Sequence, residues 1–581
     1  WDGIRLSLSD NNTISENTIS SNNLGITLRF SNKNTILKNI AHHNEGGIVL
    51  WDGANNNEVS GNLVFRERWT GIGFHSAHYN NVSNNHVFEC NSGIVLYEFS
   101  DHNIITWNEL HNNFAEGIIL KYNDNYNNVS NNLIYRNLIG IFINSSSNYN
   151  TISGNTVNDN WDGINLISCN YNTISGNTAN DNWRGINLIS CNYNTISGNN
   201  ANYNDWGIHL MQSNNNTISG NFANNNVQYG IGLSSCNNNN ISGNIVNNNH
   251  FGIYFYNCIN NTVSGNTVKH NNEGIFLWAS SYITISGNNM TRCGITPLGP
   301  LVEHTSSHKI DTTNLVNSKP VYYYANEISL GTYNFTYAGD TGQVILANCS
   351  NSNVSNLNLS YGVLGISLLY SDNNTVSGNN ATNNVYGIWI RNSVDNTVSG
   401  NTANNNIYHG ILVEYSNATT ISGNIVNNNR YGIRLSICNN ITVSGNTANN
   451  NIKDGILVEY SNATTISRNT ANFNENGIIL DGSNNNNISG NTANYNRYGI
   501  LLYESDNNTV SGNRLIGNQE CIIEVNCQGN VIQDNVCTLP PSLNYFLIIL
   551  IISITIIGVA VFVIYKNHKR FRKPQEDLEF L

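Results

Sequence analysis

The sequence predicts an all-β protein, a single-stranded right-handed parallel β-helix of about 22 coils, followed by one C-terminal transmembrane α-helix. Three observations predict the β-helix. A Gly-Ile pair recurs at steps of 22 to 24 residues, and apolar residues stand at fixed offsets after each glycine. Asn, Ser and Gly fill the positions between. Helices are excluded because no stretch between the bends is long enough, and because Asn and Gly are poor helix formers.

The repeat that begins at Gly185 shows how one coil is built. Ile186 and Leu188 alternate with polar residues, as in a strand with one buried face. Ile196 is the centre of a second short strand, and Ala201 marks a third. A coil leaves unpaired edges above and below, so it is stable only when stacked on similar coils. Stacking at about 4.8 Å allows the abundant asparagines to form hydrogen-bonded ladders.

The coils fall into two blocks, residues 1–295 and 341–537. Coils that begin at Gln343 and Cys521 lack the Gly-Ile pair but keep the apolar offsets. Residues 296–340 lack the repeat, and we predict a β-rich insert there, a loop or hairpin that projects from the rod. Residues 538–542 are the expected linker. Since the chain opens in mid-coil, we expect a truncated N-terminus that lacks its cap and signal peptide.

Residues 543–565 are the predicted transmembrane helix. This run is almost entirely apolar and is long enough to cross a bilayer as a helix. Residues 566–581 form a basic tail, so the tail is expected in the cytoplasm and the β-helix outside the cell. Many Asn-x-Ser/Thr sites suit an extracellular glycoprotein. The predicted location is therefore the cell membrane, with a single C-terminal span.

The composition excludes one class of partner. The net charge is −12 and only 11% of residues are charged. A protein that binds nucleic acid needs a basic patch or stripe, and the sequence contains none outside the short tail. We therefore expect no nucleic-acid partner. The membrane is the expected partner because of the predicted transmembrane helix.

The coils resemble the repeats of the NosD-like family and of the wider carbohydrate-binding and sugar-hydrolase (CASH) domains. The resemblance covers nearly all of the chain outside the predicted membrane helix. Residues 310–324 and 342–349 also resemble the insert of archaeal NosD-like surface proteins. The resemblance implies a right-handed parallel β-helix. It implies either a copper-handling accessory in the maturation of nitrous oxide reductase or a cell-surface protein, and the anchored rod is more similar to the latter.

Aromatic and charged residues stand two and four positions after several glycines, where an alternating strand exposes them. Such residues suit a sugar-binding groove, because rings cover the apolar faces of sugars and charges hold their polar edges. The alternative is a ladder that only stiffens the sheet. The predicted ligand-binding residues are Tyr254, Tyr256, Phe276, Trp278, Trp389, Arg391, Glu414, Arg434 and Glu459. A second aromatic set, which precedes the glycines, is expected to pack into the coil corners; it consists of Trp161, Trp183, Trp206, Tyr229, Phe251, Tyr431 and Tyr498.

Catalysis on a glycoside needs two carboxylates about 5 to 10 Å apart. Glu414 and Glu459 share a face two coils apart, and Arg434 lies between them. Such a row is also typical of a surface ion-pair ladder, and the Asp-rich motifs of polygalacturonases are absent. The sequence therefore predicts no catalytic residue and favours a non-catalytic protein.

Three residues of the insert, His304, His308 and Asp311, are candidate metal ligands by residue type. Copper and calcium are the candidate ions, but no clear motif supports either, and no cofactor is predicted. Cys521 and Cys537, near the last coil, are the candidate disulfide.

Together these features predict a membrane-anchored extracellular rod that binds glycans or envelope partners without catalysis. One alternative is a polysaccharide lyase or glycoside hydrolase. The other is a copper-binding accessory protein of the NosD type.

Overall fold

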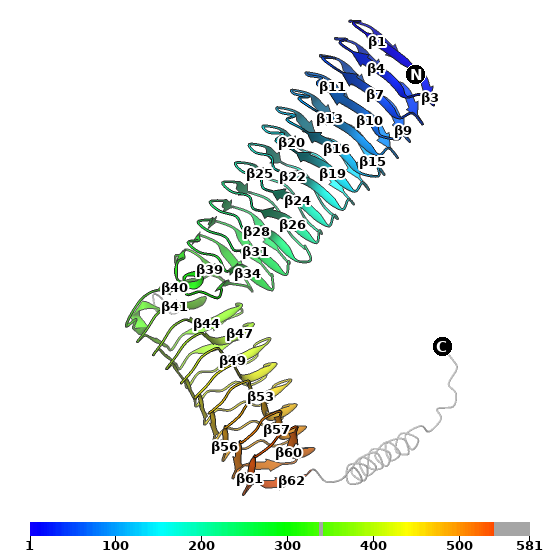
Figure 1. The fold of residues 1–581 in the computed structure, drawn as a ribbon. Coiled ribbons are helices and arrows are strands. Elements are labelled where there is room, and N and C mark those ends of the chain that lie inside the picture. The colour runs from blue at the N-terminus through cyan, green and yellow to red at the C-terminus, as the bar shows by residue number, and fades with distance from the viewer. Residues whose placement is uncertain (336–340, 540–581) are drawn as a thin grey trace, which may run out of the picture. The chain divides into compact units, whose positions relative to one another are not determined.

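The computed structural model describes residues 1–335 and 341–539. These residues form an all-β, right-handed parallel β-solenoid of about 24 turns. The chain divides into two compact units, Trp1–Asn429 and Arg430–Leu581. A complete turn contributes one long strand and up to two three-residue strands, so parallel sheets run along each unit (Figure 1).

The long strands of the first 14 turns form one sheet, whose members pair in sequence order. They are β1 (Ile4–Ser7), β4 (Leu24–Arg29), β7 (Gly46–Trp51), β10 (Thr70–His75), β13 (Ser92–Tyr97), β16 (Glu116–Lys121), β19 (Ile139–Asn144), β22 (Asp162–Ile167), β24 (Arg184–Ile189), β26 (Trp206–Met211), β28 (Tyr229–Ser234), β31 (Phe251–Tyr256), β34 (Glu273–Trp278) and β37 (Ile295–Leu298).

The third sheet of these turns is built from three-residue strands. Its first seven members are β3 (Thr18–Ser20), β6 (Ile40–His42), β9 (Leu63–Phe65), β12 (His86–Phe88), β15 (Glu109–His111), β18 (Leu133–Tyr135) and β21 (Thr156–Asn158). Along the chain of each turn, the strand of the second sheet follows the long strand and precedes the segment of the third sheet. Examples are β25 (Thr195–Ser197) and β27 (Thr217–Ser219).

The predicted register is confirmed. Ile186 pairs with Ile208, and Ile208 pairs with Ile231. All three side chains have no exposed surface, so the first apolar residue after each glycine lies in a continuous core. The repeat length therefore places equivalent residues one above another, as the periodicity predicts.

Buried asparagines form ladders at the bends. Asn199 is fully buried; its side-chain amide donates to the side-chain oxygen of Asn221 at 2.9 Å and to the Ile174 carbonyl at 2.9 Å. Its own side-chain oxygen accepts the backbone N–H and the side-chain amide of Asn177. Because each asparagine satisfies backbone groups that no strand reaches, the bends can be buried at little cost. The expected asparagine ladder is thus present.

Residues 295–325 differ from the predicted projecting insert. β37 pairs with β34, β38 (Lys309–Ile310) with β35 (Thr284–Ser286), and β39 (Leu315–Val316) with β36 (Asn289–Thr291), all in parallel. They therefore add a turn to the three sheets. The short helix α1 (Glu303–Ser306) connects β37 to β38. The sequence signal was Gly294-Ile295, a further Gly-Ile pair that follows Gly274 at a shorter step than the regular repeat.

A hairpin follows, as predicted, but its strands belong to the sheets. β39 pairs antiparallel with β40 (Lys319–Ala325) through the two residues Asn317 and Ser318, both with positive φ. Positive φ at both central residues is typical of the tight turn that fits the twist of a hairpin. β40 then pairs in parallel with β41 (Gln343–Ala347) and opens a new run of turns.

The edge of β37 is closed by a side chain. The Gln343 side-chain amide donates to the Ile295 carbonyl at 2.6 Å, and its oxygen accepts the Ile295 N–H at 3.0 Å. Gln343 itself has no exposed surface. A Cβ on Gly294 would lie 2.7 Å from the Gln343 side-chain oxygen, so only glycine allows this approach.

The new run continues in the first unit with β44 (Leu364–Leu369), β47 (Tyr386–Arg391) and β49 (His409–Glu414). The second unit contains β51 (Tyr431–Ser436), β53 (Asp454–Glu459), β55 (Asn476–Asp481), β57 (Tyr498–Tyr503) and β60 (Glu520–Val525). The sequence predicts about 22 coils, and the structure has about 24 turns. The two additional turns begin at β37 and β40. The last strands of the second unit are β61 (Val531–Gln533) and β62 (Val536–Thr538), so the coils reach residue 538.

The predicted membrane helix, 543–565, and the tail, 566–581, lie outside the described residues, as does the linker from residue 540. Within the part that the structure describes, no helix has the length and apolar character needed to cross a membrane.

Candidate functional site

The predicted aromatic residues of β31 and β34 lie side by side on the outer face of the first sheet. Tyr254 pairs with Phe276, and Tyr256 with Trp278. The Tyr254 and Phe276 rings are parallel, with centroids 5.8 Å apart. Between them in sequence, Phe255 and Leu277 are fully buried, so strand alternation turns the predicted residues outward.

The aromatic residues before the glycines do not pack into corners, contrary to expectation. Trp161 is 55% exposed and its ring lies 4.7 Å from that of Trp183. The row continues through Trp206 and Tyr229 to Phe251 at ring separations of 5.4 to 5.7 Å. The regular alternation stops at the glycine: Gly207 and Ile208 are both buried, and Trp206 lies on the outer side together with His209, whose ring is 4.6 Å away.

These two aromatic rows meet. The Tyr229 ring lies 4.8 Å from Tyr254, and the Phe251 ring lies 5.2 Å from Phe276. Stacked and tilted rings at these distances attract one another beyond the area they bury. An aromatic surface therefore extends from Trp161 to Phe276 on one side of the first unit.

A pocket of about 570 Å³ lies at the end of this surface, inside the first unit. We call it the aromatic pocket. Its lining residues are His250, Phe251, His270, Asn271, Asn272, Glu273, Phe276, Arg292, Val385, Tyr386, Ile407 and Tyr408. Apolar rings with a few polar groups at the margin are typical of a small-molecule site. Phe276 is the one predicted residue in the lining, while Tyr254 contacts Phe276 from outside.

Glu273 is the carboxylate of the aromatic pocket. Burial raises its pKa from 4.5 to about 7, and a hydrogen bond from the Thr296 hydroxyl, at 3.0 Å, partly opposes this rise. Near neutral pH a substantial fraction of Glu273 therefore carries a proton. A carboxylic acid in that state can donate a hydrogen bond or a proton to a bound molecule. Sequence reasoning missed this residue because its environment comes from other turns.

Trp389 borders the aromatic pocket through Tyr386, whose ring stacks on it at 5.3 Å. Trp389 is only 7% exposed, although it points away from the core. Its indole N–H donates to Glu414 at 3.1 Å, and Arg391 donates to the same carboxylate oxygen at 2.9 Å. These three predicted residues are thus brought together, and their polar groups bind one another.

In the second unit, Arg434 donates to Glu459 at 2.6 Å. Both predicted carboxylates, Glu414 and Glu459, therefore form an ion pair with an arginine. This arrangement matches the ion-pair interpretation of the row more closely than a pair of catalytic carboxylates, which needs an acid and a base free to reach substrate.

The predicted metal ligands of the insert do not come together. His308 is 5% exposed; one ring nitrogen receives the Ile283 N–H at 3.2 Å and the other lies 2.9 Å from the His304 carbonyl. Burial lowers the His308 pKa to about 4. Asp311 is exposed and accepts from Thr313. Both nitrogens of the buried imidazole are engaged, so His308 acts as a structural residue.

Cys521 and Cys537 form a disulfide, with Cα atoms 5.9 Å apart. This is the pairing that the sequence suggests. It joins β60 to β62 in the last turn of the second unit.

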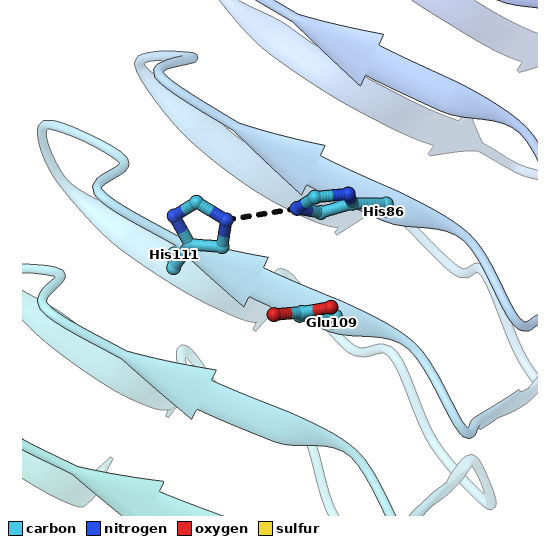
Figure 2. A group of neighbouring side chains, drawn as sticks. All are labelled: His86, Glu109 and His111. Atoms are coloured by element: carbon cyan, nitrogen blue, oxygen red, sulfur yellow. Dashed lines mark hydrogen bonds between the residues drawn. The ribbon is translucent and has the colours of Figure 1, made fainter.

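Two further features escaped sequence reasoning. A hollow of about 520 Å³ lies over Gly46 and Gly73 and is flanked by Trp51, Trp69 and Tyr97. Its signal was Gly73, two positions after Gly71, where most other turns carry a side chain. The second feature is a cluster of His86, Glu109 and His111 on the third sheet (Figure 2). Within the described residues it is the one group of three side chains whose ligand atoms lie close enough to hold a metal ion.

The stacked turns and their parallel sheets define a right-handed parallel β-helix protein. The chain belongs to the right-handed β-helix family, whose model, described as "Right handed beta helix region", matches residues 139–290 and 321–471, more than half of the chain. The NosD model, described as "Periplasmic copper-binding protein (NosD)", matches residues 1–116 and 413–537. The resemblance to NosD-like repeats is therefore confirmed.

Several solved structures are similar to the chain at low identity. The DFA-IIIase from Arthrobacter chlorophenolicus A6 without its lid is 12% identical, with a TM-score of 0.31 over 46% of this chain and 88% of that one. The periplasmic alginate epimerase AlgG is 16% identical, with a TM-score of 0.30 over 49% and 78%. The Dettilon tailspike protein is 15% identical, with a TM-score of 0.32 over 50% and 60%. No curated protein matches the chain.

Proposed function

We propose that this protein is a membrane-anchored extracellular β-helix that binds glycans in the aromatic pocket without transforming them. The observation that carries the proposal is the aromatic pocket, where Phe251 and Phe276 oppose Tyr386 and Tyr408 across about 570 Å³. Rings on two sides suit the apolar faces of sugar units, and the exposed His250, His270 and Arg292 suit their hydroxyl or carboxylate groups.

The row of rings from Trp161 to Phe251 favours a polysaccharide over a single sugar as the ligand. Its rings repeat once per turn and lead to the pocket. A chain of sugars laid along the sheet would meet a ring at each step of about 4.8 Å. The proposed ligand class is therefore a polysaccharide of the cell envelope or surroundings.

The test is equilibrium binding of the full chain, purified in mild detergent, to neutral and uronate-containing polysaccharides. Phe276→Ala is expected to weaken binding about tenfold, which corresponds to about 1.4 kcal/mol of lost ring contact. Tyr171→Ala is the matched control, because Tyr171 is an exposed ring in a comparable stack on Tyr149 and Tyr193, outside the pocket. Absence of binding, or equal losses in both variants, would reject the proposal.

Glu273 favours a second candidate, a polysaccharide lyase or hydrolase, because a carboxyl group with a pKa of about 7 suits a general acid. Against it, Glu273 is the one carboxylate in the described lining of the pocket, and hydrolysis normally uses two. Release of reducing ends or unsaturated sugars that Glu273→Gln abolishes, with binding retained, would establish the enzyme. Binding without product by the unaltered chain supports the glycan-binding protein.

The anchor is part of the proposal and is supported by the apolar run 543–565 and its basic flank. The full chain should remain with membranes after an alkaline carbonate wash. A chain that ends at residue 542 should be released, and retention of this shorter chain would contradict the anchor.

A further inference from the structure

The cluster on the third sheet is formed by two neighbouring strands. His86 on β12 pairs with Glu109 on β15, and Phe88 pairs with His111. Val87 and Leu110 between them are fully buried, so strand alternation turns His86, Glu109 and His111 outward together. All three are half-buried and hence within reach of solvent.

The ligand atoms converge. One ligand atom of each side chain lies within 4.8 Å of the other two, and the Nε2 atoms of His86 and His111 are 2.8 Å apart. Two nitrogens bound to one tetrahedral ion at about 2.0 to 2.1 Å would be roughly 3.4 Å apart. Rotations of the two rings that separate the nitrogens by a few tenths of an ångström would therefore admit an ion between them.

Neighbouring residues hold the ligands in place. The His111 ring stacks between Phe88 at 5.1 Å and Tyr135 at 4.8 Å. The Tyr135 hydroxyl donates to Glu109 at 2.9 Å, which fixes the carboxylate beside the imidazoles. Supporting contacts of this kind orient metal ligands and raise affinity. The Asn112 side-chain amide meets Nδ1 of His111 at 2.9 Å and can serve either tautomer by turning over.

The charge around the cluster also suits a cation. The His111 imidazole is half-buried beside His86, and a neutral imidazole is the form that binds metal ions. Glu109 supplies one negative charge within the cluster. Glu89 faces the same region but is paired with Arg66 at 2.7 Å, and Arg136 is the cation that opposes binding.

We propose that His86, Glu109 and His111 bind one first-row divalent transition-metal ion, through two Nε2 atoms and a carboxylate oxygen. Two imidazoles and a carboxylate with an open fourth position are a ligand set that Zn²⁺ accepts. The site lies on a different sheet from the aromatic pocket and does not depend on the proposed glycan binding.

Neighbouring turns suggest variants that preserve the fold. The register position of His111 holds Phe65, Phe88 and Tyr135 in other turns, so His111→Phe keeps the ring stack. The position of His86 holds Leu63 and Leu133, so His86→Leu keeps the packing. Glu109→Gln changes only the charge.

A second histidine pair provides the control. The Nδ1 atoms of His42 and His43 are also 2.8 Å apart, but among the residues that the structure describes they are not part of a group of three ligands. His42→Phe with His43→Asn removes this pair and introduces the Phe that the next turn has at the position of His42. It leaves the proposed site intact.

The experiment is calorimetric titration of the full, metal-free chain with Zn²⁺, followed by Co²⁺ absorption spectra. One equivalent should bind. His111→Phe and His86→Leu should each weaken binding about 100-fold, and Glu109→Gln about tenfold. The His42/His43 control should change affinity less than twofold, and the Co²⁺ bands of a four-coordinate site should disappear with His111→Phe. No stoichiometric uptake, or equal losses in site and control variants, would overturn the proposal.

Discussion

At the scale of single residues, Glu67 interrupts an asparagine ladder. Asn44 donates its backbone N–H and its side-chain amide to the Glu67 carboxylate, at 2.6 and 3.1 Å, as other asparagines do to the next asparagine. Glu67 is 2% exposed, and burial raises its pKa from 4.5 to about 7, although the bonds from Asn44 partly oppose the rise. An ionisable carboxyl group thus occupies a ladder position at which other turns have the neutral amide of an asparagine.

Glu67 should make folding pH-dependent. Between about pH 4.5 and 7 the folded chain holds a proton that the unfolded chain has released, so the free energy of unfolding falls as pH rises through this window. Glu67→Gln, which cannot ionise, should flatten part of this fall and raise stability at pH 8 by on the order of 1 to 3 kcal/mol. Thermal unfolding from pH 4.5 to 8 measures it.

The exposed carboxylate Glu16 provides the comparison, since Glu16→Gln should leave the pH profile of stability unchanged. Burial raises the pKa of Asp124 to about 8. Asp124 should therefore retain part of the fall in stability with rising pH in the Glu67→Gln protein. A Glu67→Gln protein with the unaltered profile would show that Glu67 is ionised in the folded chain.

At the scale of elements, the disulfide holds a turn that has little core of its own. The side chains of β61 and β62 are exposed along their length, unlike those of earlier turns. The bond between Cys521 and Cys537 spans 16 residues of this turn. A link of that length stabilises by about 3 kcal/mol, chiefly by restricting the unfolded chain.

Replacing both cysteines by serine should therefore loosen the last turn. Amide hydrogens of residues 520–538 should exchange about 100-fold faster, as about 3 kcal/mol implies. Cys169→Ser is the control, because Cys169 is buried and free, and Ser147 and Ser213 are buried at bends of the same run of turns. Exchange that is unaffected by the double substitution would mean that packing alone holds the turn.

The elements also show how far the sequence could predict the structure. The regular step of the Gly-Ile pairs was enough to assign the strands around Ile186 and their register, since both depend on local alternation and exact repetition. The turn at Ile295 was missed because its step is shorter than the regular one, and β40 was missed because it opens with Lys319 and Pro320 instead of glycine. These turns depend on pairing with distant strands.

The same distinction applies to the sites. The outward direction of Tyr254 and Phe276 follows from alternation, and it was predicted. The burial of Trp389 depends on Tyr386 and Glu414 from its own and the next turn, and it was not. The metal cluster was missed because its three residues become neighbours only when β12 and β15 are aligned, and these short strands carry no glycine marker.

At the scale of the whole molecule, stacked near-identical turns should tolerate removal of one. Each turn contacts chiefly its neighbours, so stability is close to a sum of turn and interface terms. Deleting one whole turn, 185–206, joins Arg184 to Gly207 and places Ile208 where Ile186 paired with Ile164. The shortened chain should keep its β-sheet circular dichroism and unfold within roughly 5 °C of the full chain.

Deleting only residues 185–195 is the contrasting case, because half a turn moves later residues to the wrong sheet. This chain should lose cooperative unfolding. If both deletions behaved alike, whether both folded or both failed, the exact repeat would not be what determines the register.

Near-identical turns carry a hazard that the end of β37 avoids. Any strand of such a chain can in principle pair with the matching strand of another copy, which leads to exchanged segments and fibres. At β37 the peptide group of Ile295 is already bound by Gln343, a single amide that offers no further strand to extend the sheet. A matching strand of a second molecule therefore cannot bind the Ile295 peptide group, which protects this edge against exchange of segments between molecules.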